Sequence, residues 1–251
     1  MHTKLSIITI NRNNAFGLRE TMASVLKQVN PEFEYIVIDG ASEDESVNVI
    51  KENQDKLTYW ESKPDNGIYH AMNKGIDKAN GEYLLFLNSG DYLLNDRVIA
   101  DAVLRLGSSD LLYGKLLISQ KGKFIEHLFP EKLTFKYFLT QSLPHPCTFI
   151  SKKLFGKVGY YNEQLKIVSD WEFFVRAVCL FNCTYEYLNR TIAVIDTDGI
   201  SRNPRMQNII ASEVDIVLRT NFSAFIDNYK LKKSRKLYFY EKIIYKIKAA
   251  F

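Results

Sequence analysis

Two aspartates in the first half of the chain each follow an apolar run that is typical of a buried strand. Asp91 comes after the run 83–87 and three polar residues, and Asp39 ends the run 35–38. Open α/β sheets bind ligands at the carboxyl ends of their parallel strands, where loops form a crevice. Asp91 is therefore offered to a ligand there. Carboxylates beside a phosphate ligand need a hard bridging cation such as Mg²⁺ or Mn²⁺. The alternative is a plain turn, since Asn-Ser-Gly-Asp is ordinary turn chemistry.

The first ninety residues alternate between strand and helix patterns, which would position both carboxylates. The expected strands are 5–10, 35–39, 57–60 and 83–87. Parallel neighbours need crossover connections, and helices supply them. The order therefore predicts an α/β fold with a Rossmann-like, mostly parallel central sheet flanked by helices.

The connecting helices are marked by apolar spacing and capping signals. In the first helix, apolar residues recur at steps of three and four as far as Val29, and Pro31 would end it. Ser42 and Glu45 have capping-box spacing, which predicts a second helix through about Asn53. The inner face of the third helix would consist of Ile68, Met72, Ile76 and Ala79.

After Asp91 the elements become shorter and less regular. The expected elements are a helix over 96–106, a hairpin of 111–118 with 123–128, a strand over 147–150, a helix from 168 to about 180, strands over 185–188 and 191–195, a lid-length loop over 196–204, and helix from 206 onward. We expect a domain over 1–204, with halves meeting near residue 94, and a helical C-terminal extension over 205–251.

Composition limits the partners and the compartment. The net charge of +4 resides in residues 230–251, which hold eight Lys or Arg and one Glu, so the body gives no reason to expect nucleic acid as a partner. Cys147, Cys179 and Cys183 are odd in number and lack a C-x-x-C pair, which indicates reduced thiols in a cytoplasmic protein. We see no signal peptide and no apolar run near the ~20 residues that span a bilayer.

Six motifs in one order carry a family resemblance. They are LSIITINRN at 5–13, IDGASED at 38–44, PDNGIY at 64–69, MNKG at 72–75, LNSGD at 87–91 and SDWE at 169–172. Together they resemble the inverting family 2 glycosyltransferases of the A-type fold (GT-A), especially those of bacterial surface-polysaccharide synthesis. The resemblance covers about residues 4–200.

The resemblance implies a role for each motif along a bound nucleotide sugar. Residues that would line the nucleoside pocket are Thr9, Asn11 and Arg12, with Asp39 on the base and Gly40 and Ser42 beside it. Residues that would lie along the diphosphate and sugar are Asp65, Asn66, Gly67, Tyr69, Asn73 and Lys74, followed by the loop of Asn88, Ser89 and Gly90. By the same resemblance Asp91 would hold the metal. Asn88 and Gly90 stand where the family commonly has carboxylates, so Asp91 is the one acidic ligand that remains in this motif. The metal, Mg²⁺ or Mn²⁺, would act as a Lewis acid on the departing diphosphate.

The acceptor hydroxyl must lose a proton as it attacks, so a carboxylate is needed as general base. By resemblance that base is Asp170. Its alternative is a structural role in the first turn of a helix, because Ser169 and Glu172 also have capping-box spacing. His145, between two prolines, could approach the metal or acceptor or be structural. Ser201 and Arg202 could form a lid over the diphosphate or an exposed loop.

The resemblance implies transfer of one sugar from a nucleotide-diphosphate sugar to an acceptor hydroxyl. UDP is the nucleotide expected from family frequency, and the acceptor would be a glycan or lipid-linked oligosaccharide of capsule, exopolysaccharide or lipopolysaccharide synthesis. The alternatives are a nucleotide-sugar-binding scaffold and a sugar nucleotidyltransferase, although the loop 11–14 lacks the glycines of the latter class. The oligomeric state stays open, a homodimer included.

The basic C-terminal segment has the pattern of an amphipathic helix. Its apolar stripe consists of Leu237, Tyr240, Ile244, Ile247 and Phe251, with Lys236, Lys242, Lys246 and Lys248 around it. Such a helix could lie on an anionic membrane surface, at the inner face of the plasma membrane. The alternative is that the stripe packs on the protein's own body or on a partner subunit.

Overall fold

The computed structural model describes residues 3–29, 32–120, 122–196 and 204–229. Its first half is a parallel sheet in the order β3-β2-β1-β4, formed by β1 (Leu5–Asn11), β2 (Phe33–Asp39), β3 (Tyr59–Ser62) and β4 (Tyr83–Phe86). The strands β1, β2 and β4 are mainly apolar and almost fully buried, as expected for a sheet covered on both faces, whereas the edge strand β3 is half-buried. The register sets Asn11 beside Asp39 and Asp39 beside Ser62, so polar residues gather at the carboxyl edge.

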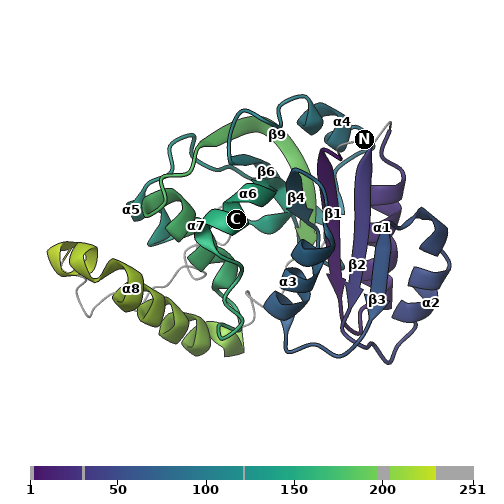
Figure 1. The fold of residues 1–251 in the computed structure, drawn as a ribbon, viewed down its shortest axis with the longest axis horizontal. Helices are drawn as coiled ribbons and strands as arrows, with labels where there is room; N and C mark the ends of the chain where they lie inside the picture. Colours follow the sequence, from purple (N-terminus) through teal and green to yellow (C-terminus); the bar gives the residue numbers. More distant parts are fainter. Residues whose placement is uncertain (1–2, 30–31, 121, 197–203, 230–251) are drawn as a thin grey trace.

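Three helices cover this parallel half, α1 (Ala15–Leu26), α2 (Ser46–Lys51) and α3 (Ile68–Lys78). Figure 1 shows α1 and α2 on one face of the strands and α3 on the other. The doubly wound arrangement is thus confirmed. The inner residues expected for α3 are buried, except that Ile68 at its first turn is half-buried.

Two helix boundaries in this half were predicted wrongly. The first helix ends at Leu26, and Val29 is 43% exposed because its N–H bonds to Asp96 O (2.7 Å) instead of continuing the helix. The second helix begins at Ser46 and ends at Lys51, and the expected capping box is absent because Ser42 Oγ is bound to Asp39 (2.6 Å). The third strand lies two residues later than expected, after the 3-10 turn η1 (Gln54–Lys56).

The second half extends the same sheet in the order β4-β8-β6-β9-β5. Its strands are β5 (Tyr92–Leu93), β6 (Leu111–Gln120), β7 (Lys123–His127), β8 (Thr148–Ser151) and β9 (Tyr185–Asp196). The predicted hairpin is confirmed as β6–β7. The two late strands predicted separately form one strand, β9, whose register with β6 shifts beside Gly114. A Cβ at Gly114 would lie 2.6 Å from Arg190 O, so the irregular pairing depends on this glycine.

Five helices accompany these strands, α4 (Val98–Val103), α5 (Phe135–Phe138), α6 (Lys152–Val158), α7 (Ser169–Cys179) and α8 (Gln207–Tyr229), with the 3-10 turns η2 (His145–Cys147) and η4 (Pro204–Met206). The helix α4 is shorter than the predicted 96–106. In Figure 1, α8 reaches away from the sheet beyond α7. The loop with Ser201 and Arg202 and the basic segment 230–251 lie outside the described residues, so these predictions stay untested.

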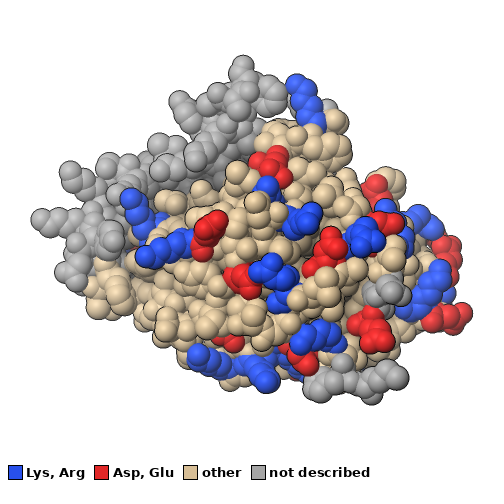
Figure 2. All heavy atoms as spheres, turned by 90° about the horizontal axis from the view of Figure 1, so that it is seen from above, with Lys and Arg blue, Asp and Glu red and all other residues tan. Residues whose placement is uncertain are grey.

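The charge distribution on the surface and the state of the cysteines agree with what the composition predicts. Figure 2 shows the molecule turned by 90° from Figure 1. On the described part of this face, basic and acidic side chains are interspersed. Cys147 and Cys183 are buried, Cys179 is half-buried, and all three are free thiols; burial raises the pKa of each. Among the described helices, none has the length and apolar character needed to cross a membrane.

Candidate active site

Four side chains at the carboxyl edge form the Asp39 cluster, namely Asn11, Asp39, Ser42 and Ser62. Asp39 is fully buried, and Oδ1 accepts hydrogen bonds from Asn11 Nδ2 (2.7 Å) and Ser42 Oγ (2.6 Å). Its Oδ2 accepts from the Ser42 N–H (2.9 Å) and from Ser62 Oγ (2.6 Å). The cluster therefore ties together the ends of β1, β2 and β3. A buried carboxylate is tolerated here because four donors replace its water.

Thr9, also predicted for the nucleoside pocket, lies deeper in the sheet. It is fully buried, and its Oγ1 lies 3.1 Å from Tyr35 Oη on β2. Thr9 thus links β1 to β2 in the core, below the Asp39 cluster. Ser62 was not predicted as a site residue, because a serine at the end of a short strand carries no distinctive local pattern.

Arg12, Gly40 and Asp65 meet where the loops after β1, β2 and β3 converge. A Cβ at Gly40 would collide with the Asp65 carboxylate and lie 3.4 Å from Arg12 Cδ, so the close approach requires glycine. Arg12 is exposed and makes no polar contact with the described residues, which leaves its guanidinium open to an anionic ligand. Asp65 Oδ1 accepts from the N–H of Gly67 (2.9 Å), which has φ +118° and leads into α3.

The predicted residues on α3 are already bonded within the protein. Lys74 Nζ lies 2.5 Å from Glu61 Oε1, and Lys63 Nζ lies 3.2 Å from Glu61 Oε2. Burial alone would raise the pKa of Glu61, but these lysines and the Tyr59 hydroxyl outweigh it and hold the pKa at about 2. Glu61 was not among the predicted residues. It stays ionised and keeps Lys74 in place.

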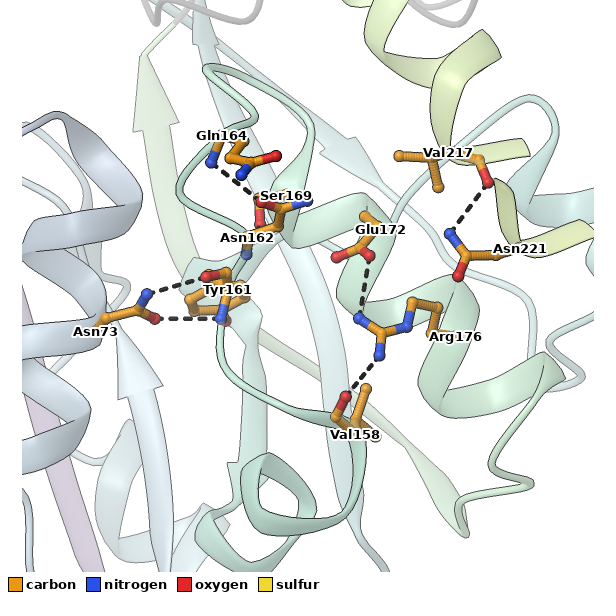
Figure 3. A network of polar contacts seen from close by, with 10 residues as sticks. All are labelled: Asn73, Val158, Tyr161, Asn162, Gln164, Ser169, Glu172, Arg176, Val217 and Asn221. Atoms are coloured by element: carbon orange, nitrogen blue, oxygen red, sulfur yellow. Dashed lines mark hydrogen bonds and ion pairs between the residues drawn. The ribbon is translucent and has the colours of Figure 1, made fainter. Parts of the chain in front are cut away.

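Asn73 holds a distant loop. Its Oδ1 accepts from the Tyr161 N–H (3.1 Å), and its Nδ2 donates to Tyr161 O (2.9 Å) and to Glu163 (2.8 Å). Figure 3 shows Asn73 facing the Tyr161 backbone from α3. The structure thus places Asn73 where it links α3 to the segment that leads into α7. Asn66 is exposed at the start of α3, where its N–H donates to His70 Nδ1 (3.0 Å).

The loop 88–91 is fastened to α1. Asn14 caps α1 by accepting from the Gly17 N–H (3.0 Å), and its Nδ2 donates to Ser89 O (3.1 Å). Thr21 Oγ1 accepts from the Gly90 N–H (3.0 Å) and lies 2.6 Å from Asp91 O. These backbone contacts fix the loop. Asn14 and Thr21 were missed, because their partners lie about seventy residues away.

Two oxygen donors in this loop fit a hard divalent cation. Asp91 is half-buried, and Asn88 Oδ1 is buried without a hydrogen-bond donor among the described residues. Carboxylate and amide oxygens suit Mg²⁺ or Mn²⁺. However, the described part of the chain has no group of three or more His, Cys, Asp or Glu side chains that could hold a metal.

A second polar group, the Asp170 centre, joins Tyr69 of α3, His145 of η2 and Asp170 of α7. Tyr69 Oη lies 2.9 Å from Asp170 Oδ1, and His145 Nδ1 lies 3.8 Å from Asp170 Oδ2. The Asp170 side chain is 25% exposed, whereas His145 is buried. Three candidates predicted from separate motifs are therefore neighbours. Of their side chains, the Asp170 carboxylate is the one that is partly exposed to solvent.

The imidazole of His145 lies in an aromatic box. Its ring centroid is 5.6 Å from that of Phe86, 5.5 Å from that of Tyr161 and 6.0 Å from that of Phe174. Burial lowers the pKa of His145, although the charge of Asp170 opposes this shift. His145 is consequently neutral at pH 7 and buttresses Asp170 without a full ion pair.

The start of α7 is held by long-range contacts instead of the expected Ser169–Glu172 capping box. The N-cap is Val168, which has no polar side chain, and Ser169 Oγ accepts from the Asn162 N–H (2.6 Å). Glu172 accepts from Arg176 (3.0 Å), whose other nitrogen donates to Val158 O (2.7 Å; Figure 3). The capping-box alternative for this motif is therefore wrong, while Asp170 does lie in the first turn.

Glu213 of α8 holds the turn that leads into α7. Its buried carboxylate accepts from the N–H groups of Lys166 (2.6 Å), Ile167 (3.1 Å) and Val168 (3.2 Å). These three hydrogen bonds fix the turn just before α7, next to the positive end of the helix dipole. The segment bearing Asp170 is thus held by α3 on one side and α8 on the other.

Comparison with known proteins identifies the family. The model of Glycosyl transferase family 2 matches residues 6–158, more than half of the chain. The chain belongs to this family. The match includes the Asp39 cluster and the loop 88–91 and ends before Asp170 and α8. This glycosyltransferase is also 34% identical over 207 residues to an uncharacterized glycosyltransferase of Mycobacterium tuberculosis, covering 78% of this chain and 76% of that protein.

Further relatives agree with this membership. A PGL/p-HBAD biosynthesis glycosyltransferase of Mycobacterium bovis is 32% identical over 201 residues, covering 77% of each chain. Among solved structures, S. aureus TarS in complex with UDP-GlcNAc aligns at a TM-score of 0.67 with 21% identity, covering 86% of this chain and 66% of that one. The mannosyltransferase PcManGT from Pyrobaculum calidifontis, in complex with GDP-Man and Mn²⁺, aligns at 0.64 with 13% identity, covering 86% and 63%. The family 2 glycosyltransferase thus has the predicted GT-A fold.

Proposed function

We propose that this family 2 glycosyltransferase is an inverting, metal-dependent enzyme that moves a sugar from a UDP-sugar to an acceptor hydroxyl. One observation carries the proposal: the start of the helix α3 contacts both the loop at the carboxyl edge of the sheet and the Asp170 centre. Gly67 begins α3 beside Asp65 at the strand ends, and Tyr69, two residues later, contacts Asp170. A donor bound along the carboxyl edge would therefore have its sugar near a partly exposed carboxylate.

In this mechanism Asp170 is the general base. The acceptor O–H bond breaks, the proton goes to Asp170, and the acceptor oxygen bonds to the anomeric carbon as the bond to the diphosphate breaks. One displacement inverts the anomeric configuration. Asp91, together with Asn88 Oδ1 of the same loop, would hold Mg²⁺ or Mn²⁺, which stabilises the negative charge on the leaving diphosphate when bound. The open guanidinium of Arg12 supports binding of an anionic donor at the same edge.

The relatives' names support this donor and acceptor class. TarS has been solved with UDP-GlcNAc and PcManGT with GDP-Man and Mn²⁺, and the Mycobacterium bovis relative is named a PGL/p-HBAD biosynthesis glycosyltransferase. We propose UDP as the nucleotide and a glycan or lipid-linked saccharide of the bacterial surface as the acceptor. The competing proposal, a nucleotide-sugar-binding scaffold, rests on Asn88 and Gly90 standing where carboxylates are common.

A ligand screen tests the proposed donor. We expect UDP and UDP-sugars to raise the melting temperature in the presence of Mn²⁺ and much less in EDTA, because ligands that bind only the folded state stabilise it by mass action. Slow release of UDP from a UDP-sugar without acceptor would separate a working transferase from a scaffold. If GDP-sugars or no nucleotide gave the shift, the UDP assignment would be wrong.

We also propose that the basic segment 230–251 binds the anionic inner face of the plasma membrane, where a lipid-linked acceptor would be found. The full chain should co-sediment with vesicles containing anionic lipid, and a chain ending at Asn228 should not, because each basic group near the surface adds about 1 kcal/mol. Vesicles of neutral lipid serve as the control for charge. Equal binding of both chains would show that the segment is not the anchor.

A further inference from the structure

The hydroxyl of Tyr69 has two acceptors and one proton. Tyr69 Oη lies 2.5 Å from Ile167 O and 2.9 Å from Asp170 Oδ1. Both distances are within hydrogen-bond range, yet a phenol can donate only one full hydrogen bond at a time. Its oxygen can also accept a hydrogen bond, so the three groups can be connected in two ways.

The two arrangements correspond to the two protonation states of Asp170. When Asp170 is a carboxylate, the Tyr69 proton can point to Oδ1. When Asp170 carries a proton, that proton can point to Tyr69 Oη while the Tyr69 proton points to Ile167 O. In the first arrangement Ile167 O gives up the Tyr69 donor, whereas in the second all three groups are paired; only hydrogens move between them.

From this geometry, and on the basis of the proposed function, we infer that Tyr69 is a positioning residue that keeps Asp170 hydrogen-bonded before and after it takes the acceptor proton. Base catalysis then needs no movement of heavy atoms at the base. Such preorganisation lowers the barrier of the chemical step more than it affects binding of the donor.

The surroundings of the three groups hold them in place. The Ile167 carbonyl cannot shift freely, because the N–H of the same peptide unit, that of Val168, is bonded to Glu213 of α8 (3.2 Å). Tyr69 itself is buried and packs against the ring of Tyr161 at 5.8 Å between centroids. His145 Nδ1 lies 3.8 Å from Asp170 Oδ2, beyond hydrogen-bond range, so the Tyr69 hydroxyl is closer to the Asp170 carboxylate than the imidazole is.

The chain offers a matched control for removing the Tyr69 hydroxyl. Tyr160 Oη donates to Asp77 Oδ1 (2.9 Å), which is also a tyrosine–aspartate bond between α3 and the segment before α7. That bond lies on the surface and does not touch Asp170. Tyr160→Phe therefore removes a tyrosine–aspartate bond that also starts from α3, without affecting the base.

We expect Tyr69→Phe to lower kcat about tenfold, the cost of one hydrogen bond to a charged group, with KM for the donor within about twofold. The solvent deuterium isotope effect on kcat should rise, because proton transfer becomes more rate-limiting. Tyr160→Phe should change neither kcat nor the isotope effect. A Tyr69→Phe enzyme with normal kcat, or with a loss confined to KM, would overturn the inference.

A double-mutant comparison separates this inference from the proposed function. In an Asp170→Asn background, Tyr69→Phe should cost little more, since Tyr69 acts through Asp170. If Tyr69→Phe cost the same factor in both backgrounds, Tyr69 would act independently and the inference would fail. If Asp170→Asn alone kept normal turnover, the proposed base itself would be wrong.

Discussion

Asp170→Asn is expected to leave donor binding near normal and to lower kcat by more than about 100-fold, the usual contribution of a general base. The amide matches the carboxylate in size and can still accept from Tyr69, but it cannot take the acceptor proton. Steady-state kinetics would give kcat, and calorimetric titration with UDP and Mn²⁺ would give the donor affinity.

Asp77→Asn on the exposed side of α3 is the matched control, because it makes the same chemical change away from the site. A loss that appeared only as a lower melting temperature, with normal turnover per folded molecule, would leave Asp170 as a residue of the first helical turn. In that case its role would be favourable interaction with the helix dipole.

Asp91→Asn is expected to abolish Mn²⁺-dependent binding of UDP and to lower turnover by more than about 100-fold, because the proposed site has one carboxylate. The fold should remain intact. The loop is held by backbone bonds to Thr21 and Asn14, and the Asp91 carboxylate lies beyond the end of β4. Titration of Mn²⁺ in the presence of UDP would measure the change, and circular dichroism would check the fold.

Asn88→Asp is expected to change the Mn²⁺ affinity in the opposite direction to Asp91→Asn. It replaces a buried amide oxygen that lacks a donor with a second charged oxygen, so Mn²⁺ affinity should rise. Near-normal turnover and an unchanged Mn²⁺ requirement in Asp91→Asn would show that the metal ligand lies elsewhere.

The first half of the fold was predictable because its elements follow local rules. Strands buried on both faces are continuous apolar runs, and α3 shows a clear apolar face. Where prediction failed, a local signal had a distant partner. Ser42 has the spacing of a helix cap but bonds to Asp39, and the two strands predicted over 185–188 and 191–195 are one strand, β9, with a shift in its register with β6.

The site was predictable in its positions and much less so in its connections. The motifs mark Asp39 and Asp91 at strand ends and Asp170 in a first helical turn, and the structure places them there. Ser62, Thr21, Glu61 and Glu213 were missed, since single polar residues without a motif gain their role only from tertiary contacts. Tyr69 was expected beside the sugar, and its contact with Asp170, 101 residues away, emerged only from the fold.

Glu213 has a consequence for how the molecule opens. Its three bonds to Lys166, Ile167 and Val168 make α8 and the start of α7 a single cooperative unit, because unfolding either one would strand a buried carboxylate or three amide groups. Local unfolding that releases α8 must therefore also release the turn that carries Asp170. The candidate base thus depends thermodynamically on a helix that lies beyond the sequence by which the family is recognised.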